Sequence, residues 1–430
     1  MDTLLRDLLA IFAVSVAVLW VSHKLRLPSV VGFLLTGVVA GPHGIGLVRA
    51  SQQVETLAEI GVVLLLFTIG LELSFERVAR AGRALLVGGP LQVVLTTVAV
   101  AAVAVAWRVP LPLAILAGLL VSLSSTAIVL RVLQDRAELD TPHGRTIMGA
   151  LIFQDLAFLP MMLALPFLAG GEGAGAAHLL RIAGGVLALV LVLFAGRWVV
   201  PRLLFQVATI RSREAFLLAI LVLGLGIAWL GSQAGLSLSL GAFLAGLLLS
   251  ESEYAHEALA STASLRDLFT SFFFVSVGML LDLAFVATHL PVVAAVTLGV
   301  LLLKIGPAAL AAAAAGLPLR SAVLSALALA QVGEFSFVLA GAGLDAGLLE
   351  GHAFQLFIAI SVLTMVLTPF VISAGSLPLM LPGRRWREER GDGAVVRALP
   401  RDQLLIVGFG LNGRNLAHAA RHAGIPYTVL

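Results

Sequence analysis

Long apolar runs separated by short polar turns follow one another along nearly the whole sequence. The runs of membrane-crossing length fall at about residues 4–23, 29–48, 54–73, 84–107, 110–133, 145–168, 178–200, 213–231, 235–250, 268–288, 290–315, 320–343 and 353–380. About 20 apolar residues in a helix cross the hydrocarbon core of a bilayer. With 60% apolar and 12% charged residues, the chain carries too much apolar surface for one water-soluble core. We therefore predict an all-α polytopic membrane protein of thirteen transmembrane helices, with the lipid bilayer as its solvent.

Charge and cysteine content exclude several classes of function. The formal net charge is only +3, and the basic residues form short clusters between apolar runs, so nucleic acid is not expected as a partner. The chain has no cysteine, which excludes disulfides, thiol chemistry and iron–sulfur clusters. The first apolar run lacks a basic n-region and a small-residue cleavage site, so we interpret it as a retained helix.

The basic residues also predict the orientation. Most of them fall in one alternating set of loops, which includes the C-terminal segment, whereas the opposite set holds only Arg6, Arg49, Arg108 and Arg181. Loops rich in lysine and arginine stay in the cytoplasm. We therefore expect a multi-pass protein of the bacterial inner membrane, with its N-terminus in the periplasm and its C-terminus in the cytoplasm.

Three ionisable residues fall in the middle of apolar runs: Asp155, Lys304 and Glu334. A charge at bilayer depth is costly, so each is a candidate functional residue. Asp155 and Lys304 have opposite charges at similar depth, which predicts an ion pair between them. That pair could hold two helices together, or Asp155 could exchange a proton for a cation, because burial makes the protonated form of a carboxyl group accessible near neutral pH.

Two polar stretches interrupt other apolar runs. Residues 122–126 (SLSST) lie in the fifth run and residues 331–334 (QVGE) in the twelfth, each a little past its middle. Transporters built from inverted repeats place broken helices at matching positions, where unwound backbone coordinates the ion. Small residues for close helix packing are the alternative. We expect the cation where the breaks cross, bound by Asp155, Thr126 and backbone carbonyls near Ser125, with Glu334 at half-helix N-termini.

Several segments resemble the monovalent cation:proton antiporter-2 family, and within it the Kef-type branch. They are GFLLTG (32–37), LFTIGLEL (66–73), LSSTA (123–127), FQDL (153–156), GAFLAG (241–246), FFVSVGM (273–279) and GEF (333–335). The resemblance spans essentially the whole chain. It implies the sodium–proton antiporter fold, with inverted repeats, crossed broken helices, a six-helix ion-carrying core, a dimerising scaffold and elevator-type alternating access.

The resemblance also concerns the ion. Many sodium-selective relatives have two adjacent acids where this chain has Gln154 and Asp155, and the Gln-Asp pair of the Kef branch implies potassium, with sodium as the alternative. One carboxylate also implies one proton per cation, unless Lys304 itself carries a proton. The loop at residues 252–259 begins like that of glutathione-gated members but continues as ASTAS (260–264), so glutathione regulation is not expected.

The composition changes near the C-terminus. We expect a transmembrane exchanger domain at residues 1–382, a cytoplasmic linker at 383–400 and, at 401–430, the start of an α/β Rossmann-like domain. Gly408, Gly410 and Gly413 lie between an expected strand and helix, as in a dinucleotide-binding fingerprint. In the Kef branch this position resembles the start of a potassium-conductance-regulating (RCK/KTN) domain, which implies a regulatory nucleotide of the NAD(H) or AMP type and no covalent cofactor.

A ligand-gated cation channel on the same scaffold remains an alternative to the antiporter, with Asp155 only lining a pore. A membrane enzyme or receptor is disfavoured, because the sequence offers neither a nucleophile–base pair nor a metal-binding cluster.

Overall fold

The chain is described by a computed structural model that covers residues 2–25, 27–48, 52–72, 82–170, 200–233 and 238–375, with 404–406, 416–417, 419–421 and 423–429 near the C-terminus. It divides into two compact units, Met1–Leu377 and Pro378–Leu430. Among the described residues of the first unit, seven helical segments are long and apolar enough to cross a membrane, and three shorter apolar helices accompany them. Most of the expected run 178–200 lies outside the described residues, so the count of thirteen stays a prediction.

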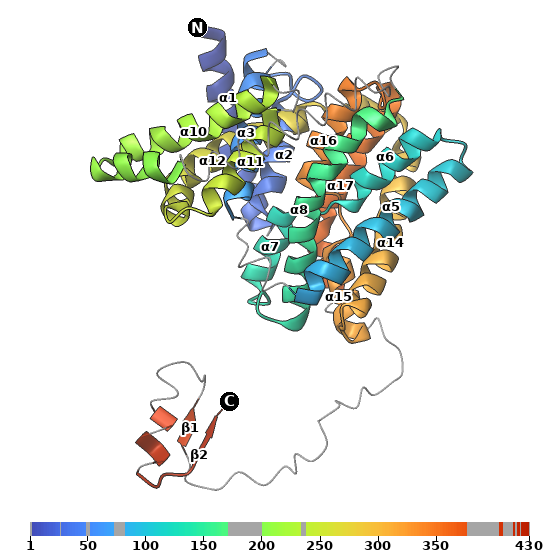
Figure 1. The fold of residues 1–430 in the computed structure, drawn as a ribbon. Helices are drawn as coiled ribbons and strands as arrows, with labels where there is room; N and C mark the ends of the chain where they lie inside the picture. The colour runs from blue at the N-terminus through green and yellow to red at the C-terminus, as the bar shows by residue number, and fades with distance from the viewer. Residues whose placement is uncertain are drawn as a thin grey trace. The chain divides into compact units, whose positions relative to one another are not determined.

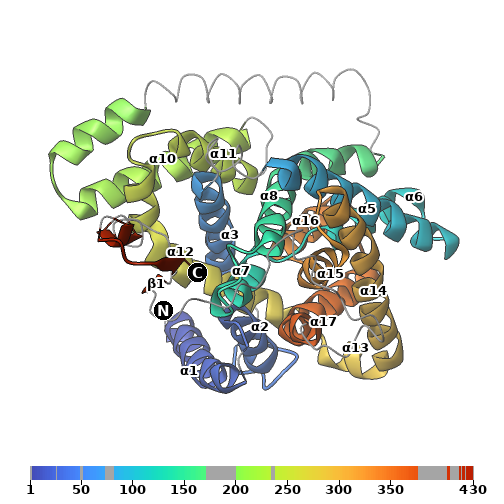
Figure 2. The same ribbon diagram turned by 90° about the horizontal axis from the view of Figure 1, so that it is seen from below.

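One group of helices, here called the scaffold, occupies one side of the first unit (Figures 1 and 2). It consists of α1 (Asp2–Lys24), α2 (Ser29–Ala40), α3 (Gln52–Glu72), α10 (Arg213–Gln233), α11 (Leu238–Ser250) and α12 (Ala255–Met279). α3 packs against both α11 and α12, and α12 packs against α2. A Cβ atom at Gly70 or Gly246 would overlap a backbone carbonyl of the facing helix, so glycine permits the close approach of α3 and α11.

The other group, here called the core, begins with the π-helical turn η1 (Ala84–Gly88). It continues through α5 (Gly89–Ala106), α6 (Leu111–Ser122), α7 (Thr126–Asp135), α8 (Pro142–Leu168), α14 (Leu290–Ala314), α15 (Leu319–Ala328), α16 (Glu334–Asp345) and α17 (Gly351–Gly375). α5 packs against α6, α8 and α14, and α15 packs against α8, α14 and α17. Figure 2 shows the core beside the scaffold.

The core contains the same pattern twice: a long helix, a broken helix and a second long helix. In the first half these are α5, α6–α7 and α8; in the second they are α14, α15–α16 and α17. The chain leaves the helix at residues 123–125, here called the first break, and at residues 329–333, the second break. The backbone is extended at Ser125 and at Gly333, where the next half-helix begins. Both breaks predicted from the polar stretches are therefore confirmed.

Two expected spans have different bounds in the structure. The run 29–48 is helical only to Ala40, because the backbone at Gly41 is extended and the chain then turns. The run 268–288 is not one helix: α12 starts earlier, at Ala255, and the short helix α13 (Leu283–Thr288) follows separately. The side chain of Asp282 begins α13 by accepting two backbone N–H bonds, from Ala284 at 2.8 Å and Phe285 at 3.1 Å.

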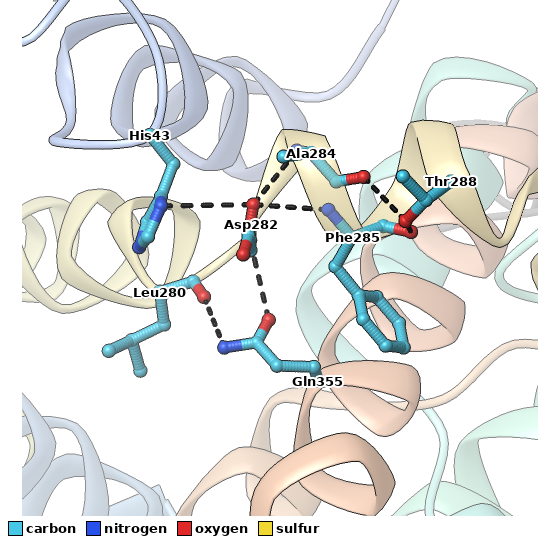
Figure 3. Close-up of polar contacts among 7 residues, drawn as sticks. All are labelled: His43, Leu280, Asp282, Ala284, Phe285, Thr288 and Gln355. Carbon is cyan, nitrogen blue, oxygen red and sulfur yellow. Dashed lines mark hydrogen bonds and ion pairs between the residues drawn. The ribbon is translucent and has the colours of Figure 1, made fainter.

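α13 connects scaffold and core, and polar contacts tie it to both (Figure 3). From the loop after α2, His43 Nδ1 lies 3.8 Å from Asp282 Oδ1. From α17, Gln355 Oε1 accepts the Asp282 N–H at 3.3 Å, and its Nε2 donates to Leu280 O at 3.1 Å. The connection is therefore held by side chains from elements on both sides.

The second unit contains two short parallel strands, β1 (Leu404–Ile406) and β2 (Tyr427–Val429), with Leu404 opposite Tyr427 and Ile406 opposite Val429. Residues 416–417 and 419–421, between the strands in the sequence, are helical. Gly408, Gly410 and Gly413 lie outside the described residues, so the nucleotide-binding fingerprint stays a prediction.

Candidate functional site: a buried crossing of two broken helices

The two breaks touch each other through their backbones. Gly333 N–H donates to Leu123 O at 3.0 Å, which joins the second break to the first. A Cβ atom on Gly333 would lie 2.5 Å from both the carbonyl carbon and the oxygen of Ser124. Beside this contact, Ser336 Oγ on α16 donates to Leu120 O on α6 at 2.7 Å. Only glycine at position 333 permits this approach, so the crossing is a specific close contact.

Further hydrogen bonds close the crossing. Ser124 Oγ donates to Leu329 O in the second break at 2.9 Å. On α17, Thr364 Oγ1 accepts the Val332 N–H at 3.2 Å and donates to Ser361 O at 2.9 Å. Thr364 on α17 thus supports the second break. The crossing is held by contacts within the protein.

Lys304 on α14 lies at the crossing and is fully buried. Its ammonium group donates to Leu123 O at 3.1 Å, to Ser124 Oγ at 3.0 Å and to Gln331 O at 2.6 Å. An ammonium has three N–H donors, and all three are used. The acceptors follow the C-terminal ends of α6 and α15, where a cation offsets the negative ends of the helix dipoles.

The expected ion pair between Asp155 and Lys304 is wrong for this structure. Both residues are described, and no ion pair joins them; the donors of Lys304 are all used by the two breaks. Similar depth along the membrane normal does not establish contact, because the carbonyl groups of an unwound backbone compete for the ammonium.

Glu334 lies where two half-helices begin, whereas Lys304 lies where the other two end. It is the first residue of α16, and its Oε1 accepts the N–H of Ala127, near the start of α7, at 3.3 Å. The carboxylate therefore lies where two helices begin, and a negative charge is favoured there. Glu334 therefore lies at the predicted position, and its role in setting the crossing stays a prediction. Its Oε2 is buried and has no hydrogen-bond partner among the described residues.

Asp155 lies on α8 beside the start of α7. Thr126 Oγ1, on the first residue of α7, is 3.2 Å from Asp155 Oδ1 and 3.4 Å from Oδ2. Asp155 is 6% exposed, whereas Thr126 is half-buried and Ala127 is exposed. The carboxylate is thus buried but close to an exposed surface.

Gln154 belongs to a buried amide network that the sequence analysis only partly anticipated. Its Oε1 accepts the Ser124 N–H at 2.7 Å, and its Nε2 donates to Gln92 Oε1 at 2.7 Å. Gln92 in turn donates to Ser122 O at 3.1 Å and to Thr96 Oγ1 at 3.2 Å. Gln92 is a single uncharged residue in an apolar run, so the sequence gives little signal for it, although its amide group also needs partners in a membrane.

Three carbonyl groups of the breaks accept hydrogen bonds from donors of the protein. Leu123 O accepts from Gly333 and Lys304, Gln331 O from Lys304, and Leu329 O from Ser124. The expectation that backbone carbonyls near Ser125 join the cation site stays a prediction. Asp155 and Thr126 offer side-chain oxygens beside the crossing, and Glu334 Oε2 is a further buried oxygen without a partner among the described residues.

Removing the ammonium of Lys304 should destabilise the crossing. In Lys304→Met, the buried carbonyl of Gln331 loses its donor, which costs about 1–3 kcal/mol, whereas Leu123 O keeps the bond from Gly333. We expect the thermal unfolding midpoint of the purified protein to fall by roughly 2–6 °C. An unchanged midpoint combined with a loss of voltage-dependent transport would contradict this role and identify Lys304 as a proton carrier.

Comparisons with known proteins agree with this architecture. The model of the sodium/hydrogen exchanger, transmembrane family matches residues 10–374. A putative K(+) efflux antiporter KefB of Alkalimonas amylolytica is 32% identical over 99% of this chain and 66% of its own length. A glutathione-regulated potassium-efflux system protein KefC of Enterobacter sp. (strain 638) is 37% identical over 66% of this chain and 46% of its own. The chain therefore spans two thirds or less of the length of these relatives.

A solved structure shares the fold. The sodium proton antiporter MjNhaP1 from Methanocaldococcus jannaschii at pH 8 has a TM-score of 0.65 and 17% sequence identity, covering 89% of this chain and 99% of that one. Membrane-crossing helices whose two broken members meet beside a buried acid define the class of secondary transporters built from inverted repeats. Since the family model covers most of its length, the chain belongs to the sodium/hydrogen exchanger family. The similarity to the Kef proteins confirms the resemblance to the Kef-type branch.

Proposed function

We propose that the protein is a secondary transporter that exchanges a monovalent cation for protons, with Asp155 as the group that binds each in turn. The observation that carries the proposal is the difference in partners among the three ionisable residues at the crossing: Lys304 and Glu334 contact backbone groups at helix ends, and among the described residues Asp155 does not. Lys304 is bound by the C-terminal ends of two half-helices and Glu334 by the N-terminal ends of two others. Asp155 is bound only by the Thr126 hydroxyl among the described residues, so it is the charge least needed by the fold.

One carboxylate binds either one monovalent cation or one proton. Because the two ions compete for the same group, cation transport in one direction is coupled to proton transport in the other. The Thr126 hydroxyl would supply a second oxygen ligand to the cation. Water or a backbone carbonyl of the breaks would complete the coordination. This ligand set predicts an electroneutral exchange of one cation for one proton.

Potassium is the favoured cation and sodium the alternative. The relatives named above as K(+) efflux antiporter and potassium-efflux system support potassium, as does the Gln154–Asp155 pair in place of two acids. The solved sodium proton antiporter supports the fold, and at 17% identity its ion gives no argument for the ion of this chain.

Movement of the core against the scaffold would give alternating access of the elevator type. All six residues proposed at the site, Ser125, Thr126, Gln154, Asp155, Lys304 and Glu334, belong to the core, so they would move together.

The proposal includes thirteen spans in a bacterial inner membrane, a periplasmic N-terminus, a cytoplasmic C-terminus and a homodimer formed through the scaffold. A nucleotide bound at Gly408, Gly410 and Gly413 would regulate transport.

Flux measurements in proteoliposomes test the proposal. We expect K+ added outside to drive proton movement, reported by a pH-sensitive dye inside, with Na+ and Rb+ measured in parallel at several membrane potentials. Exchange should saturate with cation concentration and depend weakly on potential. Unitary conductance in planar bilayers, with cation flux in the absence of any pH gradient, would instead establish the gated channel.

Replacing Thr126 by alanine tests the cation ligands. We expect the apparent Km for the cation to rise about threefold to tenfold, because one hydroxyl contact is worth about 0.5–1.5 kcal/mol. The pH optimum should hardly move, because the hydroxyl does not titrate. Thr126→Ser keeps the hydroxyl and should stay close to wild type. A pH optimum displaced by about one unit at unchanged Km would show that Thr126 acts on the carboxyl group alone.

A further inference from the structure

A cavity of about 340 Å³ lies in the core, away from Asp155, where α7 ends and α8 and α15 begin. Apolar side chains from four helices line part of it: Leu133 on α7, Ile147 on α8, Leu324 on α15 and Ile372 on α17. The cavity is open on one side and is not part of the crossing described above. Its lining is therefore mixed, with apolar side chains beside charged ones, and it suits a ligand that is itself amphipathic.

The mouth of the cavity is charged. Arg136 and Arg320 line it together with Glu138 and His143. His143 Nε2 lies 3.2 Å from Glu138 Oε2, so the acid already has a partner. Arg136 Nη2 donates to Ser373 Oγ at 2.6 Å, which leaves other N–H groups of its guanidinium for a ligand. The mouth therefore offers two arginines to an anion.

We propose that this cavity binds an anionic phospholipid, with its phosphate at Arg136 and Arg320 and its glycerol and upper acyl chains against the apolar walls. Guanidinium groups match the geometry of phosphate oxygens, and basic pockets between membrane helices take anionic headgroups. A soluble anion would gain little from Leu133, Ile147 and Leu324. Leu319 and Val323 on α15, the helix that also supplies Arg320 and Leu324, are exposed apolar side chains.

The walls of the cavity join the two halves of the core. α7 follows the first break and α15 precedes the second, so one bound lipid would contact both half-helices on this end of the core. Binding would therefore stabilise the crossing in the folded state. This inference does not depend on which ion is transported or on whether transport occurs.

The test measures thermal unfolding of the purified full chain in a neutral detergent during titration with phosphatidylglycerol or phosphatidylcholine. We expect phosphatidylglycerol to raise the unfolding midpoint saturably and phosphatidylcholine to have little effect. Arg136→Gln/Arg320→Gln should need about 25-fold more phosphatidylglycerol for half of the effect, since each arginine contributes about fivefold. Arg131→Gln/Arg145→Gln removes the same charge from α7 and α8 outside the cavity and should respond like wild type.

Three outcomes would overturn the proposal: equal weakening by the two double variants, equal protection by phosphatidylcholine, or equal protection by glycerol 3-phosphate at matched concentration. The last would indicate a site for soluble anions. If Arg136→Gln/Arg320→Gln does not fold, Arg320→Gln alone serves, because Arg320 is exposed. An approximately fivefold weakening in that variant supports the lipid site, and an unchanged titration rejects it.

Discussion

The Asp155→Asn variant is expected to lose cation-dependent proton flux completely while remaining folded. Asparagine keeps the shape of the side chain and can still accept the Thr126 hydroxyl bond, which is 3.2 Å long in the wild type. It cannot release or capture a proton, so a cation and a proton no longer compete for one site. Proteoliposomes loaded with a pH-sensitive dye measure the loss, and the unfolding midpoint in detergent checks the fold.

An acid outside the site provides the control for this experiment. Asp345 ends α16 in the same core and is exposed, so Asp345→Asn should exchange cations for protons at the wild-type rate. Exchange by Asp155→Asn at the rate of this control would refute the central role of Asp155. Cation flux that persists without any proton movement would show that the carboxylate lines a conducting pore.

The second large effect is expected from Gly333→Ala. The added methyl group would meet the carbonyl carbon and oxygen of Ser124 at 2.5 Å and the nitrogen of Ser125 at 2.8 Å. These atoms are backbone, so they cannot turn aside as a side chain would, and the two breaks must separate. Forced separation of packed elements costs about 1–3 kcal/mol. We expect a lower unfolding midpoint and at least a tenfold loss of exchange.

Gly341→Ala is the matched control, because the same substitution within α16, the half-helix that begins directly after Gly333, meets nothing within 4 Å. Alanine is also the better helix former by roughly 1 kcal/mol, so this variant should be as stable as the wild type or slightly more stable. Equal behaviour of the two variants in unfolding and transport assays would mean that the contact at Gly333 is not needed to hold the breaks together.

The main features of the core could be predicted from the sequence because membrane burial makes polar residues conspicuous. Ser124 and Ser125 interrupt an apolar run, and a break in the helix follows at that point. Asp155, Lys304 and Glu334 are ionisable residues in the middle of apolar runs, and all three lie at or beside the crossing. The cost of a polar group in lipid restricts it to such places.

The partners of these residues could not be predicted, because they depend on distances across the fold. Lys304 binds two backbone carbonyls and a serine hydroxyl, which no sequence pattern distinguishes from a lysine paired with Asp155. Gln92 supports Gln154 from another helix, a contact set by the packing of α5 on α8. Asp282 caps the start of α13. The apolar run 268–288 does not reveal this helix start, because its length and composition are those of one continuous span.

The hydrogen bonds across the crossing join parts of the chain that are made far apart in time. Ser124 bonds a carbonyl 205 residues further along, and Leu120 accepts from a serine 216 residues away. Synthesis proceeds from the N-terminus, so the first break enters the membrane before any of these partners exists. An unsatisfied backbone group in lipid costs several kcal/mol. The first half of the core therefore stays incomplete until α15 and α16 have been inserted, and the ion site is among the last parts of the protein to assemble.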